Sequence, residues 1–139
     1  MISTVEKVLF LKSVDLFKEI PGEDLAQIAQ IADEVEFLAE VPVFKEGEVG
    51  EALYLILEGA VRIHRGDKTI VELGEKECFG EMSILDSEPR SASVTALRDL
   101  VALKIQREDF GEILATKSEI ARGIIKVLTH RLREANKRS

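Results

Sequence analysis

The feature that most restricts the fold of this chain is a change in the spacing of its apolar residues. Up to about residue 34 they recur at helical intervals, whereas residues 35–106 consist of short β-rich runs separated by turn residues. Helical spacing returns beyond Arg107. The glycines that separate the runs are Gly47, Gly50, Gly59, Gly66 and Gly74. Because strands and helices are segregated along the chain, the sequence predicts an α+β fold.

The middle region, residues 35–106, is predicted to form about eight short strands of a small antiparallel sandwich or jelly roll. The unbroken apolar run Leu53–Leu57 is expected in its core. Near the end of the region, large apolar residues alternate with Ala102, Lys104 and Gln106. This alternation predicts a strand with one buried face and one face in water.

Helices are predicted at both ends of the chain. Residues 1–34 contain a capping-box spacing at Ser3–Glu6 and a second apolar stripe after Pro21-Gly22, so two N-terminal helices are expected. Residues 107–139 are expected to form two C-terminal helices, separated near Lys117-Ser118. The apolar stripe of the last helix consists of Ile120, Ile124, Leu128 and Leu132.

Composition favours a single domain, because 139 residues with 45% apolar character are enough for one core. No run of about 18 apolar residues is present, and Glu6 and Lys7 interrupt the N-terminal segment. Neither a membrane span nor a secretory signal is therefore expected. The expected location is the cytoplasm. One cysteine, Cys78, and two histidines make a poor set of zinc ligands, which disfavours a metal site.

Charge disfavours nucleic acid as a direct partner. The net charge is −7, which repels a phosphate backbone unless basic residues gather in one place. The basic residues that gather at the end of the chain are Arg131, Arg133, Lys137 and Arg138. A basic helix end complements the helix dipole, and we prefer this interpretation to DNA or RNA binding.

One stretch of the β-rich region, residues 79–94 with the sequence FGEMSILDSEPRSASV, is not explained by sheet building. Gly80 permits close backbone approach, and residues 82–85 suit a single helical turn whose first N–H groups attract an anion. Arg90 supplies a planar fork of donors that matches two phosphate oxygens, and Ser91 adds a hydroxyl. The combination predicts a bound phosphate.

The acid next to this group, Glu81, is a poor neighbour for a bare phosphate. It is well suited to accept a hydrogen bond from a sugar hydroxyl, so the phosphate is predicted to belong to a nucleotide. The alternative is a buried salt bridge in which Glu81 and Arg90 pair with each other across a turn. The spacing of the two residues leaves both hypotheses open.

The segments Phe79–Leu85 and Pro89–Val94 closely resemble the phosphate-binding cassette of cyclic nucleotide-binding domains. That family includes the catabolite activator protein, the regulatory subunits of cyclic-nucleotide-dependent kinases, and cyclic-nucleotide-gated channels. The family's early strands and turns are resembled by Phe44–Gly47 with Gly50 and by Leu53–Gly59, and the start of its first C-terminal helix by Arg107–Phe110. The resemblance implies one domain over residues 1–139, an eight-stranded antiparallel jelly-roll barrel with helices at both ends.

The resemblance also implies roles for single residues of the cassette. Glu81 would accept from the ribose 2′-OH, with the Gly80 backbone nearby. Arg90 would bind the exocyclic oxygens of the cyclic phosphate, and the backbone N–H groups of Ser83 and Ala92 would complete the cradle. The expected ligand is a cyclic purine nucleotide, cyclic AMP (cAMP) or cyclic GMP (cGMP), without a metal.

Four further positions are assigned with an alternative beside each. Val71 and Met82 resemble members of the apolar wall against the purine, and ordinary core packing is the alternative for both. Arg131 is the candidate to cover the base from the last helix, and a solvated arginine is the alternative. Ser91 resembles the hydroxyl residue that contacts a guanine in some relatives, but serine there also occurs in cAMP-binding ones.

Two residues depart from the family pattern. Lys76 stands where the family commonly has a turn glycine, so strain is expected if the backbone there requires a positive φ. Gln106 replaces the Ser or Thr expected to cap the next helix, a loss of about 1 kcal/mol of helix stability.

The function expected from this resemblance is that of a regulatory sensor, not an enzyme, which moves its C-terminal helix over the bound ligand. That helix would contact an effector or a second copy of the chain. The alternatives are a ligand-free interaction or dimerisation module, and the sensor half of a transcription regulator without its DNA-binding domain. A metal-dependent jelly-roll enzyme is disfavoured because His64 and His130 stand alone in the sequence.

Overall fold

The computed structural model describes residues 2–138, apart from the side chains of Ser83 and Ile84. The described chain forms two compact units, one made of residues 2–31 and 109–138 and the other of Ala32–Glu108. Within the described residues, no helix combines the length and apolar character needed to cross a membrane.

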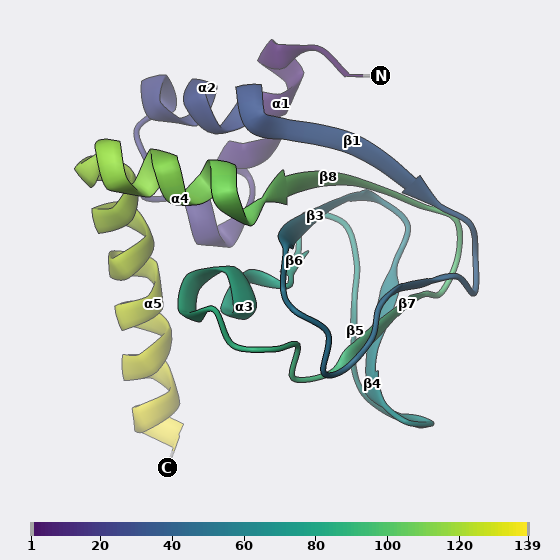
Figure 1. Ribbon diagram of the computed structural model, residues 1–139. Coiled ribbons are helices and arrows are strands. Elements are labelled where there is room, and N and C mark those ends of the chain that lie inside the picture. The colour runs from purple at the N-terminus through teal and green to yellow at the C-terminus, as the bar shows by residue number, and fades with distance from the viewer. Residues whose placement is uncertain (1, 139) are drawn as a thin grey trace. The chain divides into compact units, whose positions relative to one another are not determined.

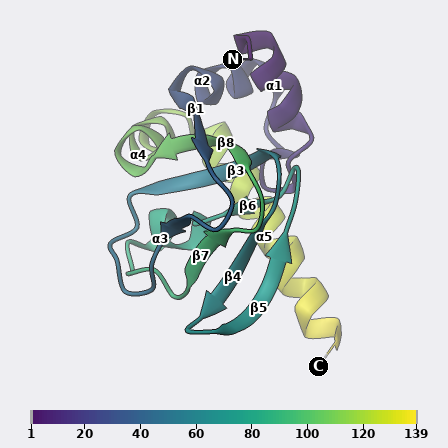
Figure 2. The ribbon, with the colours of Figure 1, turned by 90° about the vertical axis from the view of Figure 1, so that its right-hand side faces the viewer.

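The unit Ala32–Glu108 is built from two antiparallel four-stranded sheets. One sheet has the strand order β1 (Ala32–Phe37), β8 (Leu100–Gln106), β3 (Ala52–Glu58) and β6 (Cys78–Phe79), of which β1, β8 and β3 are seen side by side in Figure 1. The other has the order β2 (Pro42–Phe44), β7 (Ser93–Ala96), β4 (Val61–Arg65) and β5 (Lys68–Leu73), and Figure 2 shows its β4–β5 hairpin. The α+β class with antiparallel strands is therefore confirmed.

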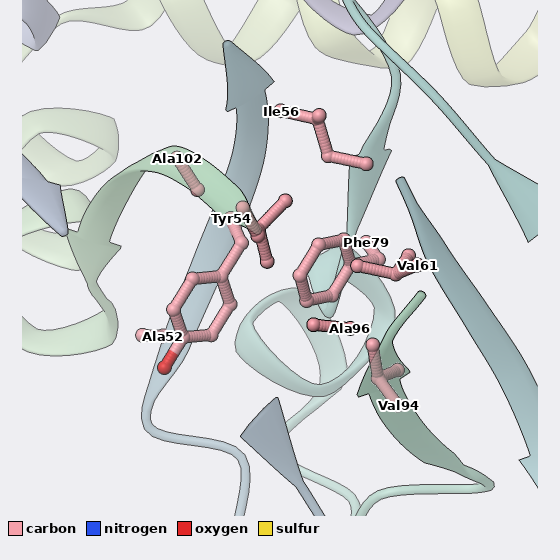
Figure 3. Close-up of a cluster of buried hydrophobic side chains, with 9 residues drawn as sticks. Ala52, Tyr54, Ile56, Val61, Phe79, Val94, Ala96 and Ala102 are labelled. Carbon is pink, nitrogen blue, oxygen red and sulfur yellow. The ribbon is translucent and has the colours of Figure 1, made fainter. Parts of the chain in front are cut away.

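A buried cluster contributed by both sheets forms the core of this unit. Tyr54 and Phe79 lie at its centre with stacked rings, whose centroids are 5.1 Å apart at an interplanar angle of 10° (Figure 3). The smaller side chains Ala52, Ala96 and Ala102 surround them and allow close packing. The apolar run predicted for the core, Leu53–Leu57, is confirmed for residues 53–56, which are all buried, whereas Leu57 is half-buried.

The prediction of a wet face on β8 is wrong. Ala102 is fully buried in the cluster between the sheets, and Leu103 and Ile105 on the opposite face are fully buried as well. Strand β8 lies between β1 and β3, and an inner strand covered on both faces does not need the polar alternation of a surface strand. Lys104 and Gln106 are half-buried rather than exposed.

The N-terminal helices form as the sequence predicts. Helix α1 (Thr4–Lys12) begins with Ser3 as N-cap, and the reciprocal bonds between Ser3 and Glu6 make the expected capping box. Helix α2 (Gly22–Ile31) follows a short 3₁₀ turn, η1 (Asp15–Phe17). The β-rich region then starts at Ala32 rather than near residue 35, because Ala32 already pairs with Ile105 of β8.

The C-terminal part contains helix α4 (Arg107–Thr116) and helix α5 (Ser118–Arg138), separated at residue 117 as predicted. The first half of the predicted stripe of α5 is buried, whereas Leu132 is 63% exposed. Gly123 faces Ile20, and a Cβ atom at this glycine would lie 3.0 Å from the Ile20 side chain. Gly123 therefore allows α5 to pack closely against the segment that contains Ile20.

Candidate functional site

The segment of residues 79–94 connects β6 with β7 and contains the short helix α3 (Glu81–Asp86), the helical turn that the sequence predicts. Gly80 lies between β6 and α3 with a φ of +84°. A Cβ atom at Gly80 would lie 2.7 Å from Arg90 Nη1 and 2.9 Å from the Ala52 carbonyl oxygen. Glycine is therefore required here both by the backbone conformation and by the close approach of Arg90.

Arg90 is the centre of the site and is only 5% exposed. Its Nη1 donates to the carbonyl of Gly80 at 3.0 Å, and its Nη2 donates to the carbonyl of Ala52 at 2.7 Å. Nε has no hydrogen-bond partner among the described residues, although it is buried. A buried cationic donor without a partner is costly, so Nε has an unused capacity to donate a hydrogen bond to an acceptor.

The guanidinium of Arg90 also stacks on an aromatic ring, since its Cζ lies 3.9 Å from the centroid of Phe44. Burial lowers the pKa of Arg90, and nearby groups partly offset this effect. Those groups are Tyr54, Glu48, Glu81 and Glu51. Because the ordinary pKa of arginine is so high, the side chain remains a cation.

The main chain on both sides of Arg90 is fixed by hydrogen bonds to another loop. The Arg90 N–H donates to the Glu48 carbonyl at 2.8 Å, and the Gly47 N–H donates to the Arg90 carbonyl at 2.9 Å. The Glu46 N–H donates to the hydroxyl of Ser93 at 2.9 Å. These bonds set the position of Arg90 independently of its side chain.

Glu81, the first residue of α3, is half-buried. Within residues 2–138, no ion pair joins Glu81 to Arg90, and the Glu81 carboxylate has no hydrogen-bond partner. Its charge is still near enough to raise the pKa of Arg90. The alternative of a buried Glu81–Arg90 salt bridge is therefore wrong, and the carboxylate retains its acceptor capacity.

Comparison with known proteins then decides the family. The family model described as cyclic nucleotide-binding domain matches residues 34–117, which include both sheets from β2 onward and the whole Arg90 site. The chain belongs to the cyclic nucleotide-binding domain family. The resemblance of residues 79–94 to the family's phosphate-binding cassette agrees with this assignment.

Three relatives illustrate the breadth of the match. The chain is 40% identical over 100 residues, 68% of its own length, to a cyclic AMP receptor protein of Thermus thermophilus, of which it covers 46%. It is 30% identical over 131 residues, 91% of its length, to a CRP-like cAMP-activated global transcriptional regulator of Mycobacterium tuberculosis, of which it covers 58%. The crystal structure of the N-terminal domain of a transcriptional regulator from Streptomyces coelicolor aligns with a TM-score of 0.81 at 29% identity, over 94% of each chain. The chain thus spans about half the length of the two curated relatives.

The remaining site residues that the family resemblance implies lie in different surroundings. Val71 on β5 and Met82 on α3 are 43% and 64% exposed, so the alternative of core packing is wrong for both. Ala92 is buried, and Ser91 is exposed and accepts a hydrogen bond from Arg65 Nε through its carbonyl at 3.0 Å. Ser83 lies in α3, and its side chain is outside the described residues.

Arg131 belongs to α5, in the unit of residues 2–31 and 109–138. Its Nη2 donates to the carboxylate of Asp15 at 3.0 Å, so in this structure it is neither free nor simply solvated. The Asp15 carboxylate also pairs with Lys18 at 2.9 Å. The expected alternative for Arg131 is thereby refined to a surface ion pair within its own unit.

Two contributors to the site were not predicted from the sequence as such. Phe44 provides the ring under Arg90, and Ala52 provides a carbonyl acceptor. Phe44 is the first residue of a segment that resembles the family, and Ala52 directly precedes another, Leu53–Gly59. A carbonyl acceptor cannot be recognised from the identity of the side chain that it belongs to. For the aromatic ring beneath Arg90, the sequence feature that could have pointed to it was the family resemblance of the segment that begins at Phe44.

Proposed function

We propose that this chain is a regulatory module that binds a cyclic purine nucleotide, cAMP or cGMP, in the site around Arg90. One observation carries the proposal. Arg90 is buried as a cation without a carboxylate partner among the described residues, and its Nε is unpaired. A phosphodiester anion would supply the missing charge and acceptor in one step.

The roles of the remaining residues follow from the chemistry of such a ligand. Glu81 is proposed to accept from the ribose 2′-OH, because its carboxylate has no partner within the described chain. The backbone of Gly80 and the N–H groups of Ser83 and Ala92 are proposed to complete the cradle, and Ser91 to lie beside it. We further propose that the exposed Val71 and Met82 pack against the base.

We also propose how occupancy is signalled. The two four-stranded sheets are proposed to form a jelly-roll barrel, and α5 is proposed to move over the bound ligand, with Arg131 covering the base. Arg131 must then leave Asp15, which requires little free energy because an exposed ion pair contributes about 0 to 1 kcal/mol. The module would act in the cytoplasm, without a metal and without catalysing a reaction.

A second candidate is favoured by the surface of α5 and by the relatives. Ile125 and Leu132 are exposed apolar residues of this helix, as expected for contact with a second copy or an effector. Both curated relatives are named as receptor or transcription regulator and are about twice as long as the match. The chain is therefore also proposed as the sensor part of such a regulator, with a ligand-free dimerisation module as the alternative.

Calorimetric titration of both cyclic nucleotides into the parent chain and two variants tests the proposal. At about 0.3 kcal/mol for each of about 22 non-hydrogen ligand atoms, the parent Kd is expected near 10 μM. Arg90→Lys loses the two-pronged fork and should weaken binding by about 1.5 to 3 kcal/mol. The control is Arg98→Lys, which changes an exposed arginine and should bind like the parent. No heat with the parent at millimolar ligand, or equal affinity of parent and Arg90→Lys, would refute the site.

Hydrogen exchange on the same samples tests the signalling step. Saturating ligand should change the protection of amides in residues 118–135, because α5 exchanges its contacts with η1 for contacts with the ligand. Identical exchange of this helix with and without ligand, in a protein that binds, would leave the nucleotide site intact and remove the proposed motion.

A further inference from the structure

A question about Arg90 that is separate from the proposed ligand is what holds its guanidinium in place within the chain. Buried cations are normally held by carboxylates, yet no ion pair of the described residues includes Arg90. Two main-chain carbonyls accept from its Nη atoms at 3.0 and 2.7 Å. These bonds restrain the guanidinium least in rotation about the line that joins the two Nη atoms. The guanidinium also lies over the ring of Phe44, whose centroid is 3.9 Å from Cζ.

The Phe44 ring is itself held by an aromatic cluster. It lies 5.9 Å from the ring of Phe79 and 6.3 Å from the ring of Tyr54, at tilted angles of 47° and 39°. Its backbone is fixed where β2 pairs with β7, opposite Val94 and next to a register shift after Pro42. A ring that packs against two buried aromatic rings cannot turn freely, so its face presents a fixed surface to Arg90.

We propose that Phe44 is a positioning residue for the phosphate-binding arginine, an inference that rests on the proposed function. The negative face of the ring attracts the guanidinium and sets its plane without neutralising its charge. A carboxylate in the same place would hold Arg90 equally well but would compete with the phosphate for it. Phe44 keeps the cation oriented and available, with Nε unpaired for the ligand.

The orientation can be tested in the ligand-free protein by NMR. The Hε resonance of Arg90, assigned by its loss in Arg90→Lys, should be shifted upfield by the ring current of Phe44. Phe44→Leu should return it to the ordinary position, and Phe44→Tyr should keep the shift because it retains the ring. An unshifted Hε in the parent would overturn the proposal without any reference to nucleotide binding.

The effect on binding is tested by titrating cAMP into matched variants. Phe44→Leu should weaken binding about 3- to 30-fold, the range that a lost cation–π contact covers between exposed and desolvated sites. Phe44→Tyr should bind within about 2-fold of the parent. The control is Phe37→Leu, which removes a ring that also packs on Tyr54, with centroids 6.2 Å apart. Among the described residues, the cation–π contact of Arg90 is with Phe44 and not with Phe37. The affinity of Phe37→Leu should match that of the parent.

The outcomes separate this inference from the proposed function. If the parent binds and the two leucine variants weaken binding equally, Phe44 acts only through packing and the inference is wrong, while the nucleotide site stands. If the parent does not bind any cyclic nucleotide, the proposed function is wrong, and the NMR experiment still decides whether the ring orients Arg90.

Discussion

Two arginines of this chain, Arg90 and Arg131, are both proposed to contact the ligand, and they differ in burial and in their partners. Arg90 lies in the unit Ala32–Glu108, is buried, and is bound by two main-chain carbonyls and an aromatic ring. Arg131 lies on α5 in the other unit, is well exposed, and pairs with the carboxylate of Asp15.

The difference shows how the same type of side chain can serve two purposes in one protein. Arg131 has a partner of opposite charge in solvent, so its contact is weak, screened by salt and readily exchanged. Arg90 is buried and forms no ion pair among the described residues, although three glutamates are near enough to raise its pKa. An anion that binds directly to the guanidinium would compensate this burial. We infer that Arg90 determines whether a ligand binds, whereas Arg131 can at most respond to it.

The largest effect is expected for Gly80→Ala, which disturbs the surroundings of Arg90 directly. Alanine at this position would have to adopt the positive φ of Gly80. Its Cβ would also lie only 2.7 Å from Arg90 Nη1 and 2.9 Å from the Ala52 carbonyl oxygen. Together these costs should lower the free energy of unfolding by about 2 to 4 kcal/mol, measured by urea denaturation.

The matched control for this change is Gly66→Ala in the β4–β5 turn. Gly66 has a φ of +57°, but nothing lies within 4 Å of the Cβ that alanine would add. It should therefore lose only the conformational part, about 1 kcal/mol. Equal losses in the two variants would mean that crowding by Arg90 contributes nothing, and that the site is looser than the structure indicates.

The sequence predicted the features of this chain that depend on neighbouring residues. The capping box of Ser3 and Glu6 and the helical turn after Gly80 arise from contacts within a few positions, and both are confirmed. The prediction of a wet face on β8 was wrong because the burial of Ala102 depends on which strands flank β8. The order of strands in a sheet cannot be derived from the alternation of residues along one strand.

The candidate site shows even more clearly that local sequence patterns do not predict contacts between distant residues. The sequence singled out Arg90 and Gly80 through their residue types, but the acceptors of Arg90 lie 10 and 38 positions away and are backbone atoms. The partner of Arg131, Asp15, lies 116 positions away. Contacts of this separation are created by sheet pairing and helix packing, which side-chain chemistry alone does not specify.

A smaller change in the free energy of unfolding, a gain instead of a loss, is expected for Lys76→Gly just before β6. This variant measures the cost of a positive φ separately from the crowding that Gly80→Ala adds. Lys76 has a φ of +71°, so the strain that the departure from the family's glycine predicted is present. Lys76→Gly keeps the N–H that donates to the Ile56 carbonyl at 2.9 Å and should stabilise the fold by about 0.5 to 1 kcal/mol. Urea denaturation measures this difference.

The neighbouring Glu75 offers the control for Lys76→Gly, because it is exposed in the same turn and is not among the residues with positive φ. Glu75→Gly should only add flexibility to the unfolded chain and destabilise the protein by about 0.5 to 1 kcal/mol. A loss of stability in Lys76→Gly would show that the positive φ carries no strain, and the estimate for Gly80→Ala would then rest on crowding alone.

The smallest effect is expected at Arg131, through its partner Asp15. Hydrogen bonds from Lys18 and then Arg131 lower the pKa of the Asp15 carboxylate below its ordinary value. A group whose pKa is lower in the folded state stabilises the fold above its unfolded pKa, about 3.9, and loses this contribution as pH falls through the folded value. Asp15→Asn should therefore be less stable than the parent at pH 7, and the difference should disappear as pH falls through the lowered pKa of the folded state.

The size of this difference is limited by solvent, because the Asp15 side chain is 55% exposed. About 0.3 to 0.5 kcal/mol is expected at pH 7, measured by urea denaturation, and about 1 M salt should abolish it. The same salt should leave the Gly80→Ala loss unchanged, since that loss comes from steric contact in a buried place. If salt instead left the Asp15→Asn difference intact, the Arg131 pair would be as protected from solvent as Arg90, and α5 could not release it readily for a ligand.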